Sequence, residues 1–279
     1  MVPVTAVVFG LMSAAIWGAG DFCGGLAARR ATANSVVIAS QLVGVLLLTA
    51  LAGLFREPWP AASDLAWGAL AGVAGNVGLL ALDRGLASGR MGVVAPLSAV
   101  LSAALPVLVS ALFDGLPGWV TLVGFALALA GVWLLAQPAG GAVFRLNELG
   151  LPLLAGLGFG LFFVFVDQVS AAAVFWPLVM ARLASLAFLT SVTVAGRQKL
   201  WPPAGVLPLT ALSGVLDAAG NAFFALATQT GRLDVAAVLS ALYPGSTVLL
   251  AWAVLRERLT RAQLAGVAAA LVAIILIAW

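Results

Sequence analysis

Two carboxylates lie within stretches of the sequence that are otherwise apolar. Asp217 lies near the middle of segment 206–229, and Asn221 follows it by one helical turn on the same face. Asp21 lies in the sequence GAGDFCGG, and Trp17 precedes it by one turn. A charged carboxylate in the middle of a membrane-spanning helix costs at least about 2.5 kcal/mol. These acids must therefore be paired, solvated from a cavity or protonated, and they are candidates for a functional site.

Each acid has a functional and a structural interpretation. Asp217 is either a proton-coupling or solute-binding carboxylate, or a buried strut that hydrogen-bonds Asn221 or a nearby serine. Asp21, with Trp17 above it, would suit a cationic or zwitterionic solute, because aromatic faces attract cations. The alternative for Asp21 is a shallow position, in contact with water at the lipid headgroups.

Arg182 is a cation in a third apolar stretch, about eight residues into segment 174–195. An arginine at that depth needs an acidic partner, and both Asp167 and Asp217 are close enough along the chain to be considered. One interpretation is a structural ion pair that locks neighbouring helices. The other is direct binding of a carboxylate of the solute.

Uncharged polar side chains in the apolar segments form a second group of candidates. Alone, such a group more often bonds two helices together than binds a solute. Tyr243, the only tyrosine, precedes Pro244, which lacks a backbone donor and so frees a carbonyl at membrane depth. The candidates of this group are Gln41, Asn76, Ser98, Ser240 and Tyr243.

The composition identifies the elements that must position these residues. The chain is 63% hydrophobic and 8% charged, with a mean hydropathy of +1.17, whereas soluble domains are about 45–50% apolar and about 25% charged. Repeated apolar runs of about 20 residues are typical of an all-α integral membrane protein. Because histidine is absent and Cys23 is the only cysteine, we expect no metal and no cofactor.

Glycine, proline and charge clusters divide the chain into ten predicted transmembrane helices and leave no room for a soluble domain. The predicted helices are 4–27, 33–55, 64–86, 91–113, 118–137, 149–170, 174–195, 206–229, 233–255 and 260–278.

The sequence contains an internal repeat with an offset of 142 residues. Residues 65–136 align with residues 207–278 without a gap, and about 22 of about 72 positions are identical. The aligned pairs include a Gly-Arg turn, at residues 89–90 and 231–232. We therefore predict a first five-helix repeat over 1–137, a linker over 138–147 and a second repeat over 148–279. Since each half has an odd number of helices, the two repeats must be inverted in the membrane, and inverted repeats with binding near the midplane are common in secondary transporters.

Three features of the sequence carry a resemblance to a known family: the AAIWGAGDF stretch of the first helix, Arg182 in the seventh, and the final segment LSALYPGSTVLLAWAVLRERLTRAQLAGVAAALVAIILIAW. In these features the sequence resembles the drug/metabolite transporter superfamily, specifically its ten-helix members with two EamA-type domains. The final segment is similar to the family's pattern of a proline-containing helix closed by Glu257. The first half departs from it, because Gly115 stands opposite Glu257 and Pro106 is not opposite Pro244. The resemblance implies a ten-helix basket with a central cavity, often in an exporter of metabolites or amino acids.

We therefore expect a secondary transporter of a small organic solute that works by alternating access, with Asp217 or Asp21 exchanging protons. The alternatives are an uncoupled facilitator or channel-like permease and, last, a membrane-embedded enzyme. The sequence has no DxxD-type metal pair, GxSxG or HExxH motif and no histidine base, so we expect no enzyme.

The expected partners are the solute and the lipid bilayer of the cell (inner) membrane, with protons and a second copy of the chain as further candidates. The net charge of +3 gives no reason to expect nucleic acid. Lysine and arginine concentrate in the connections after odd-numbered helices, which by the positive-inside rule places both termini outside. Members of the family that the chain resembles often have both termini inside, so the charge distribution and the resemblance give opposite orientations.

Overall fold

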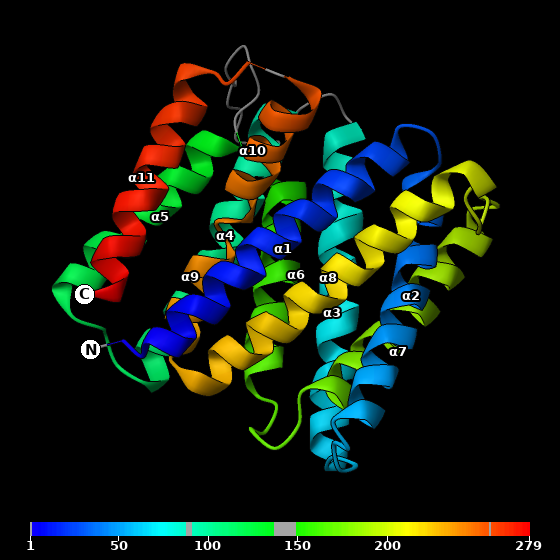
Figure 1. The fold of residues 1–279 in the computed structure, drawn as a ribbon, viewed down its shortest axis with the longest axis horizontal. Helices are drawn as coiled ribbons and strands as arrows, with labels where there is room; N and C mark the ends of the chain where they lie inside the picture. The colour runs from blue at the N-terminus through cyan, green and yellow to red at the C-terminus, as the bar shows by residue number, and fades with distance from the viewer. Residues whose placement is uncertain (1, 88–90, 137–148, 257) are drawn as a thin grey trace.

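The computed structural model describes residues 2–87, 91–136, 149–256 and 258–279. Over these residues it contains eleven α-helices and no strand, which confirms an all-α membrane protein (Figure 1). The predicted linker over 138–147 lies outside the described residues. The helices are α1 (Val4–Ala28), α2 (Ala33–Leu54), α3 (Ala62–Ala87), α4 (Met91–Phe113), α5 (Trp119–Leu135), α6 (Gly150–Asp167), α7 (Phe175–Ala195), α8 (Leu207–Thr230), α9 (Leu233–Ser240), α10 (Tyr243–Leu255) and α11 (Arg261–Ala278).

Ten membrane spans fit this arrangement. Within the described residues, nine spans are long and apolar enough to cross a bilayer, and α5 is a shorter apolar helix. The predicted boundaries agree with the observed ones to within a few residues, because glycine, proline and charge mark the ends of apolar helices.

The ninth span differs from its prediction as one helix over 233–255. It is two helices, α9 and α10, separated by Ala241 and Leu242. Pro244 lies in the first turn of α10, where its missing N–H costs no helical hydrogen bond. Continuing α9 through Pro244 would remove one such bond and crowd the preceding turn, so the chain restarts the helix instead.

Eight of the spans pack as a ring. Going round it, α1 packs on α8, α8 on α2, α2 on α7, α7 on α3, α3 on α6, α6 on α4, and α4 on α9, which returns to α1. The pair formed by α5 and α11 lies outside this ring, as Figure 1 shows at the end of the molecule that carries α10. Each contact in this ring therefore joins a helix from the first half of the chain to one from the second half.

Two crossings in the ring are related by the internal repeat. A Cβ atom on Gly72 of α3 would overlap the Ala181 carbonyl of α7, and one on Gly214 of α8 would overlap the Ser40 carbonyl of α2. Gly72 aligns with Gly214 at the repeat offset, and Ser40 aligns with Ala181 after a shift of one residue. The backbones approach closely at both places because glycine leaves the room.

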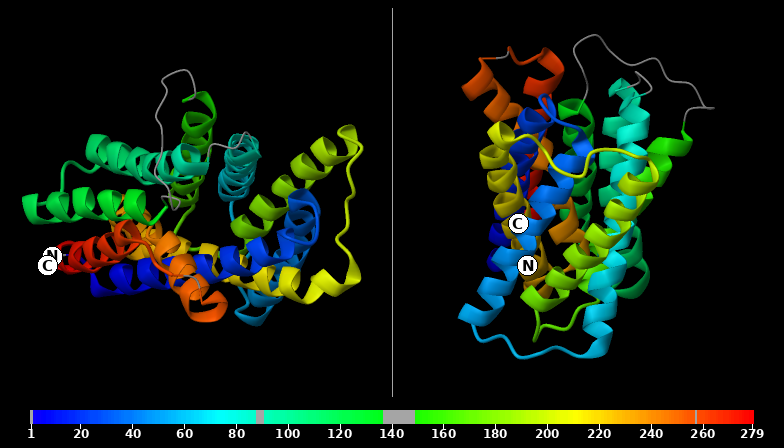
Figure 2. Two further views of the ribbon diagram at one scale, coloured as in Figure 1. Left: turned by 90° about the horizontal axis from the view of Figure 1, so that it is seen from above. Right: turned by 90° about the vertical axis from the view of Figure 1, so that its right-hand side faces the viewer.

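The helix connections fall into two groups at opposite ends of the spans. The connections over 55–61, 114–118, 168–174 and 231–232 share one end with the chain termini, which lie close together in Figures 1 and 2. We call this the latched end, because its side chains tie the connections together. The connections over 29–32, 196–206 and 256–260 lie at the other end, which we call the arginine-rich end.

Candidate functional site

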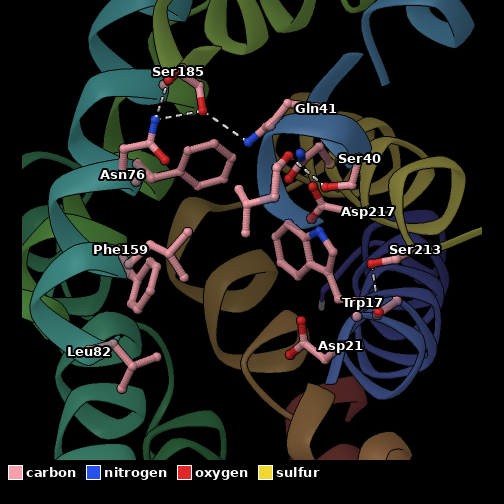
Figure 3. Close-up of a pocket in the computed structure, with 18 of the residues that line it drawn as sticks. Trp17, Asp21, Ser40, Gln41, Asn76, Leu82, Phe159, Ser185, Ser213 and Asp217 are labelled. Carbon is pink, nitrogen blue, oxygen red and sulfur yellow. Dashed lines mark hydrogen bonds between the residues drawn. The ribbon is translucent and has the colours of Figure 1, made fainter. Parts of the chain in front are cut away.

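A cavity of about 450 Å³ lies within the helix ring (Figure 3). Its lining comes mainly from α1, α2, α3, α6, α7 and α8, with Ser102 from α4 and Tyr243 from the start of α10. Eight of the ten residues that the sequence singled out line this one cavity. They are Trp17, Asp21, Gln41, Asn76, Arg182, Asp217, Asn221 and Tyr243.

Arg182 of α7 pairs with Asp217 of α8 rather than with Asp167. The guanidinium Nη1 donates to Asp217 Oδ2 at 2.5 Å and to Gln41 Oε1 at 2.6 Å. The arginine side chain is 4% exposed, whereas the aspartate side chain is 40% exposed. Arg182 is therefore an almost fully buried part of the cavity wall, and Asp217 presents its carboxylate to the cavity.

The hydrogen bonds continue from Arg182 to two further helices. Gln41 of α2 donates through Nε2 to the Ser185 hydroxyl at 2.9 Å. Asn76 of α3 donates to the same hydroxyl at 2.7 Å and to the Ser185 carbonyl at 2.8 Å. Figure 3 shows these bonds converging on Ser185. One polar network thus connects α8, α7, α2 and α3 along one wall of the cavity.

Asp21 lies apart from this network. It is exposed and lines the cavity, and the described part of the chain offers its carboxylate no hydrogen bond or ion pair. Figure 3 places it on the opposite side of Trp17 from Asp217. The cavity therefore holds one carboxylate with a counter-ion, Asp217, and one without, Asp21.

An aromatic wall faces the polar network. Trp17 of α1 is buried and stacks on Phe163 and Phe224, with ring centroids 5.7 and 5.8 Å apart. Phe159 and Phe162 of α6 complete this wall. Trp17 is held in place partly because Gly220 of α8 has no side chain that would meet the indole.

Asn221 and Tyr243 line the cavity with polar groups that have no side-chain hydrogen bond among the described residues. In place of the strut between Asp217 and Asn221, one of the interpretations above, Asp217 accepts a hydrogen bond from Arg182. Both polar groups are therefore available to a solute.

Ser98 and Ser240 lie outside the cavity lining. Ser98 donates to the carbonyls of Val94 and Ala95 in its own helix at 2.8 and 3.1 Å. Ser240 is fully buried and donates to the Gly10 carbonyl at 3.4 Å. The roles predicted for these two serines stay predictions.

The sequence did not single out several residues that line or support the cavity. Ser185 joins Gln41 to Asn76, Ser40 and Ser213 add hydroxyls, and the phenylalanines of α6 form the aromatic wall. A serine or phenylalanine is common in any apolar helix, so its type alone carries no signal. The positions of Ser185 and the α6 phenylalanines at the cavity become visible only once α6 and α7 are packed against α3.

Comparison with known proteins gives a fold for the whole chain and a family match for its second half. A crystal structure of a protein with 18% sequence identity superposes with a TM-score of 0.77, over 98% of this chain and 96% of that chain. At this identity the likeness shows the fold alone. No curated protein matches the chain. Residues 148–279 match the EamA-like transporter family. The chain is therefore a multi-pass membrane protein in which residues 148–279 match the EamA-like transporter family, consistent with the drug/metabolite transporter superfamily.

Proposed function

We propose that the chain is a secondary transporter that moves a small organic solute, such as a metabolite or an amino acid, out of the cell through this cavity by alternating access. The observation that carries the proposal is the position of the cavity along the helices. Its lining reaches Ala28, Ala33 and Leu82 near the arginine-rich end. On the way to the latched end it stops at Trp17 in α1 and at Gly72 in α3, which lie well inside these helices. Access from one side only is what alternating access requires of a single state.

Side-chain contacts at the latched end support the same proposal. The Glu57 carboxylate accepts hydrogen bonds from the backbone N–H groups of Val174, Phe175 and Trp176 at 2.9–3.2 Å. These groups begin α7, so the acid also meets the positive end of the helix dipole. The other state of the transporter would have to loosen this end.

Further contacts extend the latch to neighbouring helices. Asp64 of α3 accepts from the backbone and hydroxyl of Ser170 at 3.0 and 2.8 Å. Gln229 of α8 donates to the carbonyls of Ser170 and Ala173 at 3.3 and 2.9 Å. The connection between α6 and α7 is therefore bonded on both sides, to α3 and to α8.

We further propose that the chain is two inverted EamA-type repeats, 1–137 and 148–279, in the cell (inner) membrane. The equivalent glycine crossings, Gly72 on α7 and Gly214 on α2, support the repeat. An inverted repeat provides two states of similar energy, because each half can adopt the arrangement of the other.

We assign proton exchange to Asp21 rather than to Asp217. The charged and titratable side chains that line the cavity with it are Asp217, Arg182 and Tyr243. Arg182 neutralises Asp217, whereas Asp21 has no counter-ion among the described residues. An apolar cavity disfavours the charged form of a carboxylate, and most strongly where no counter-ion is present, so protonation is favoured more at Asp21 than at Asp217.

The test is flux into proteoliposomes of labelled amino acids and neutral or cationic metabolites, with and without a pH gradient. We expect the gradient to drive flux in the wild type and in Asp21→Glu, which keeps the carboxylate, and to have no effect in Asp21→Asn. Flux that ignores the gradient in the wild type would make the protein an uncoupled facilitator. Coupling that survives Asp21→Asn and disappears in Asp217→Asn would move the proton site to Asp217.

A further inference from the structure

We propose that the solute is an organic cation, with one positively charged nitrogen bound at Asp21 and a small apolar or aromatic body against the wall of Trp17 and the α6 phenylalanines. This inference rests on the proposed function only in taking the cavity as the solute site. It narrows the solute from a general metabolite to a charge class.

The accessible charges in the cavity are both negative. Asp21 is exposed, and the Asp217 side chain is 40% exposed. Arg182 is the only cation among the lining residues, and its side chain is 4% exposed. A solute therefore meets two carboxylates directly and the guanidinium only from behind Asp217.

Neither terminal nitrogen of Arg182 is open to a carboxylate of the solute. Its Nη1 is occupied by Asp217 and Gln41 at 2.5 and 2.6 Å. Its Nη2 is buried and has no hydrogen-bond partner in the described structure. Because Nη2 is buried and the Asp217 and Asp21 carboxylates are not, an anionic group would meet these two acids before it met Arg182.

The sum of charges gives the number of positive groups on the solute. Arg182 and Asp217 cancel, so the unpaired charge that remains in the lining is that of Asp21. A monocation neutralises it. A zwitterion places a third carboxylate near those of Asp21 and Asp217, and an anion adds to the repulsion without supplying a positive charge.

The walls around Asp21 suit an apolar body on the cation. Trp17 lies one helical turn from Asp21, and Phe159 and Phe162 line the same space. An aromatic face beside a carboxylate stabilises a cation by both charge and quadrupole. A volume of about 450 Å³ is within the range for small-molecule sites.

The test compares four ligands of similar size on the full chain in nanodiscs by isothermal titration calorimetry. The ligands are 2-phenylethylamine, phenylalanine, 3-phenylpropanoate and 2-phenylethanol, which differ mainly in charge. We expect the amine to bind at least tenfold more tightly than the other three. Asp21→Asn should reduce the amine to the affinity of the alcohol, whereas Asp114→Asn, which removes a charge outside the cavity, should leave the ratio unchanged.

Each other outcome overturns the inference. Phenylalanine or 3-phenylpropanoate binding as tightly as the amine would contradict it, as would an amine preference that survives Asp21→Asn or an amine that does not bind. If Asp21→Asn does not fold, Asp21→Glu keeps the charge and must keep the preference.

The flux assay separates this inference from the proposed function. An amine that binds at Asp21 but is not transported would contradict transport and leave the solute class intact. Transport of the anion alone would contradict the solute class and leave the transporter intact.

Discussion

At the scale of single residues, the ion pair between Arg182 and Asp217 carries the first prediction. Asp217→Asn leaves a buried guanidinium whose remaining partner is Gln41. We expect a loss of about 1.5–3 kcal/mol in the free energy of unfolding, the usual worth of a hydrogen bond to a charged group. Thermal unfolding in detergent measures it.

The control for that prediction is a double-mutant cycle. Arg182→Gln removes the cation, so Asp217→Asn in that background should cost at least about 1 kcal/mol less than it does alone. Additive losses would mean that the pair seen in the structure does not contribute to stability.

Ser185 gives a second prediction at this scale. Its hydroxyl accepts from both Gln41 and Asn76, so Ser185→Ala leaves Gln41 Nε2 without an acceptor, while Asn76 keeps the Ser185 carbonyl. We expect a loss of about 1–2 kcal/mol in unfolding free energy.

Ser191 of the same helix is the matched control. It is exposed and bonds only the Ala187 carbonyl one turn earlier, so Ser191→Ala should stay within about 0.5 kcal/mol of the wild type. If the two serine variants unfold at the same temperature, the network through Ser185 is not a stabilising one.

The residues of the cavity were partly predictable, and the limit has a physical reason. An aspartate or arginine in an apolar helix is costly enough to stand out in the sequence, which is why Asp21, Arg182 and Asp217 were found. A serine costs almost nothing there, so Ser185 became visible only once α7 was placed beside α2 and α3. The choice of Asp217 over Asp167 as the partner of Arg182 likewise depends on helix packing.

At the scale of helices, the contact between α1 and α10 carries the third prediction. A Cβ atom on Gly18 would overlap Ser246 and come within 2.5 Å of the Tyr243 carbonyl, whereas one on Gly25 of the same helix would meet nothing within 4 Å. Gly18→Ala should therefore push α10 away and cost about 1–3 kcal/mol.

Gly25→Ala should instead stabilise α1 by up to about 1 kcal/mol, because alanine favours the helix. Both variants replace glycine by alanine in α1, and they differ only in the atoms that the new methyl group meets. Unfolding temperatures that change in the same direction would show that α10 does not pack on α1 at Gly18.

The break between α9 and α10 marks the limit of sequence-based prediction for the helices. Apolar length predicts a span over 233–255 and Pro244 predicts a freed carbonyl, but neither says whether the helix bends or stops. The position of α10 after the break is fixed by α1, where the Gly18 carbonyl accepts from Thr247 at 3.0 Å. That contact joins residues 229 positions apart, beyond the reach of any local pattern.

At the scale of the whole molecule, the two ends differ in charge as well as in contacts. The connections of the arginine-rich end carry Arg29, Arg30, Arg197, Lys199, Arg256 and Arg258. The latched end carries Glu57, Asp64, Asp114 and Asp234 against Arg56 and Arg232. The cavity reaches toward the positive end, and the termini lie at the negative one.

This asymmetry leads to the last prediction, which concerns the side of the membrane from which a reagent can enter the cavity. In a Cys23→Ser background, Val37→Cys places a thiol in the cavity lining near the start of α2, and Gln168→Cys places one on the exposed latched end. A membrane-impermeant maleimide should label the two from opposite sides of sealed vesicles. By the positive-inside rule, Val37→Cys should react from the cytoplasmic side.

Protection by a ligand ties the labelling to the site. Because Val37 and Asp21 line one cavity, 2-phenylethylamine should slow labelling of Val37→Cys and leave that of Gln168→Cys unchanged. Labelling of Val37→Cys from both sides would indicate a continuous pore. A carrier that is closed at the latched end shields the first turns of α2 from reagent on that side of the membrane. Labelling of Val37→Cys only from the side of Gln168→Cys would contradict the one-sided cavity itself.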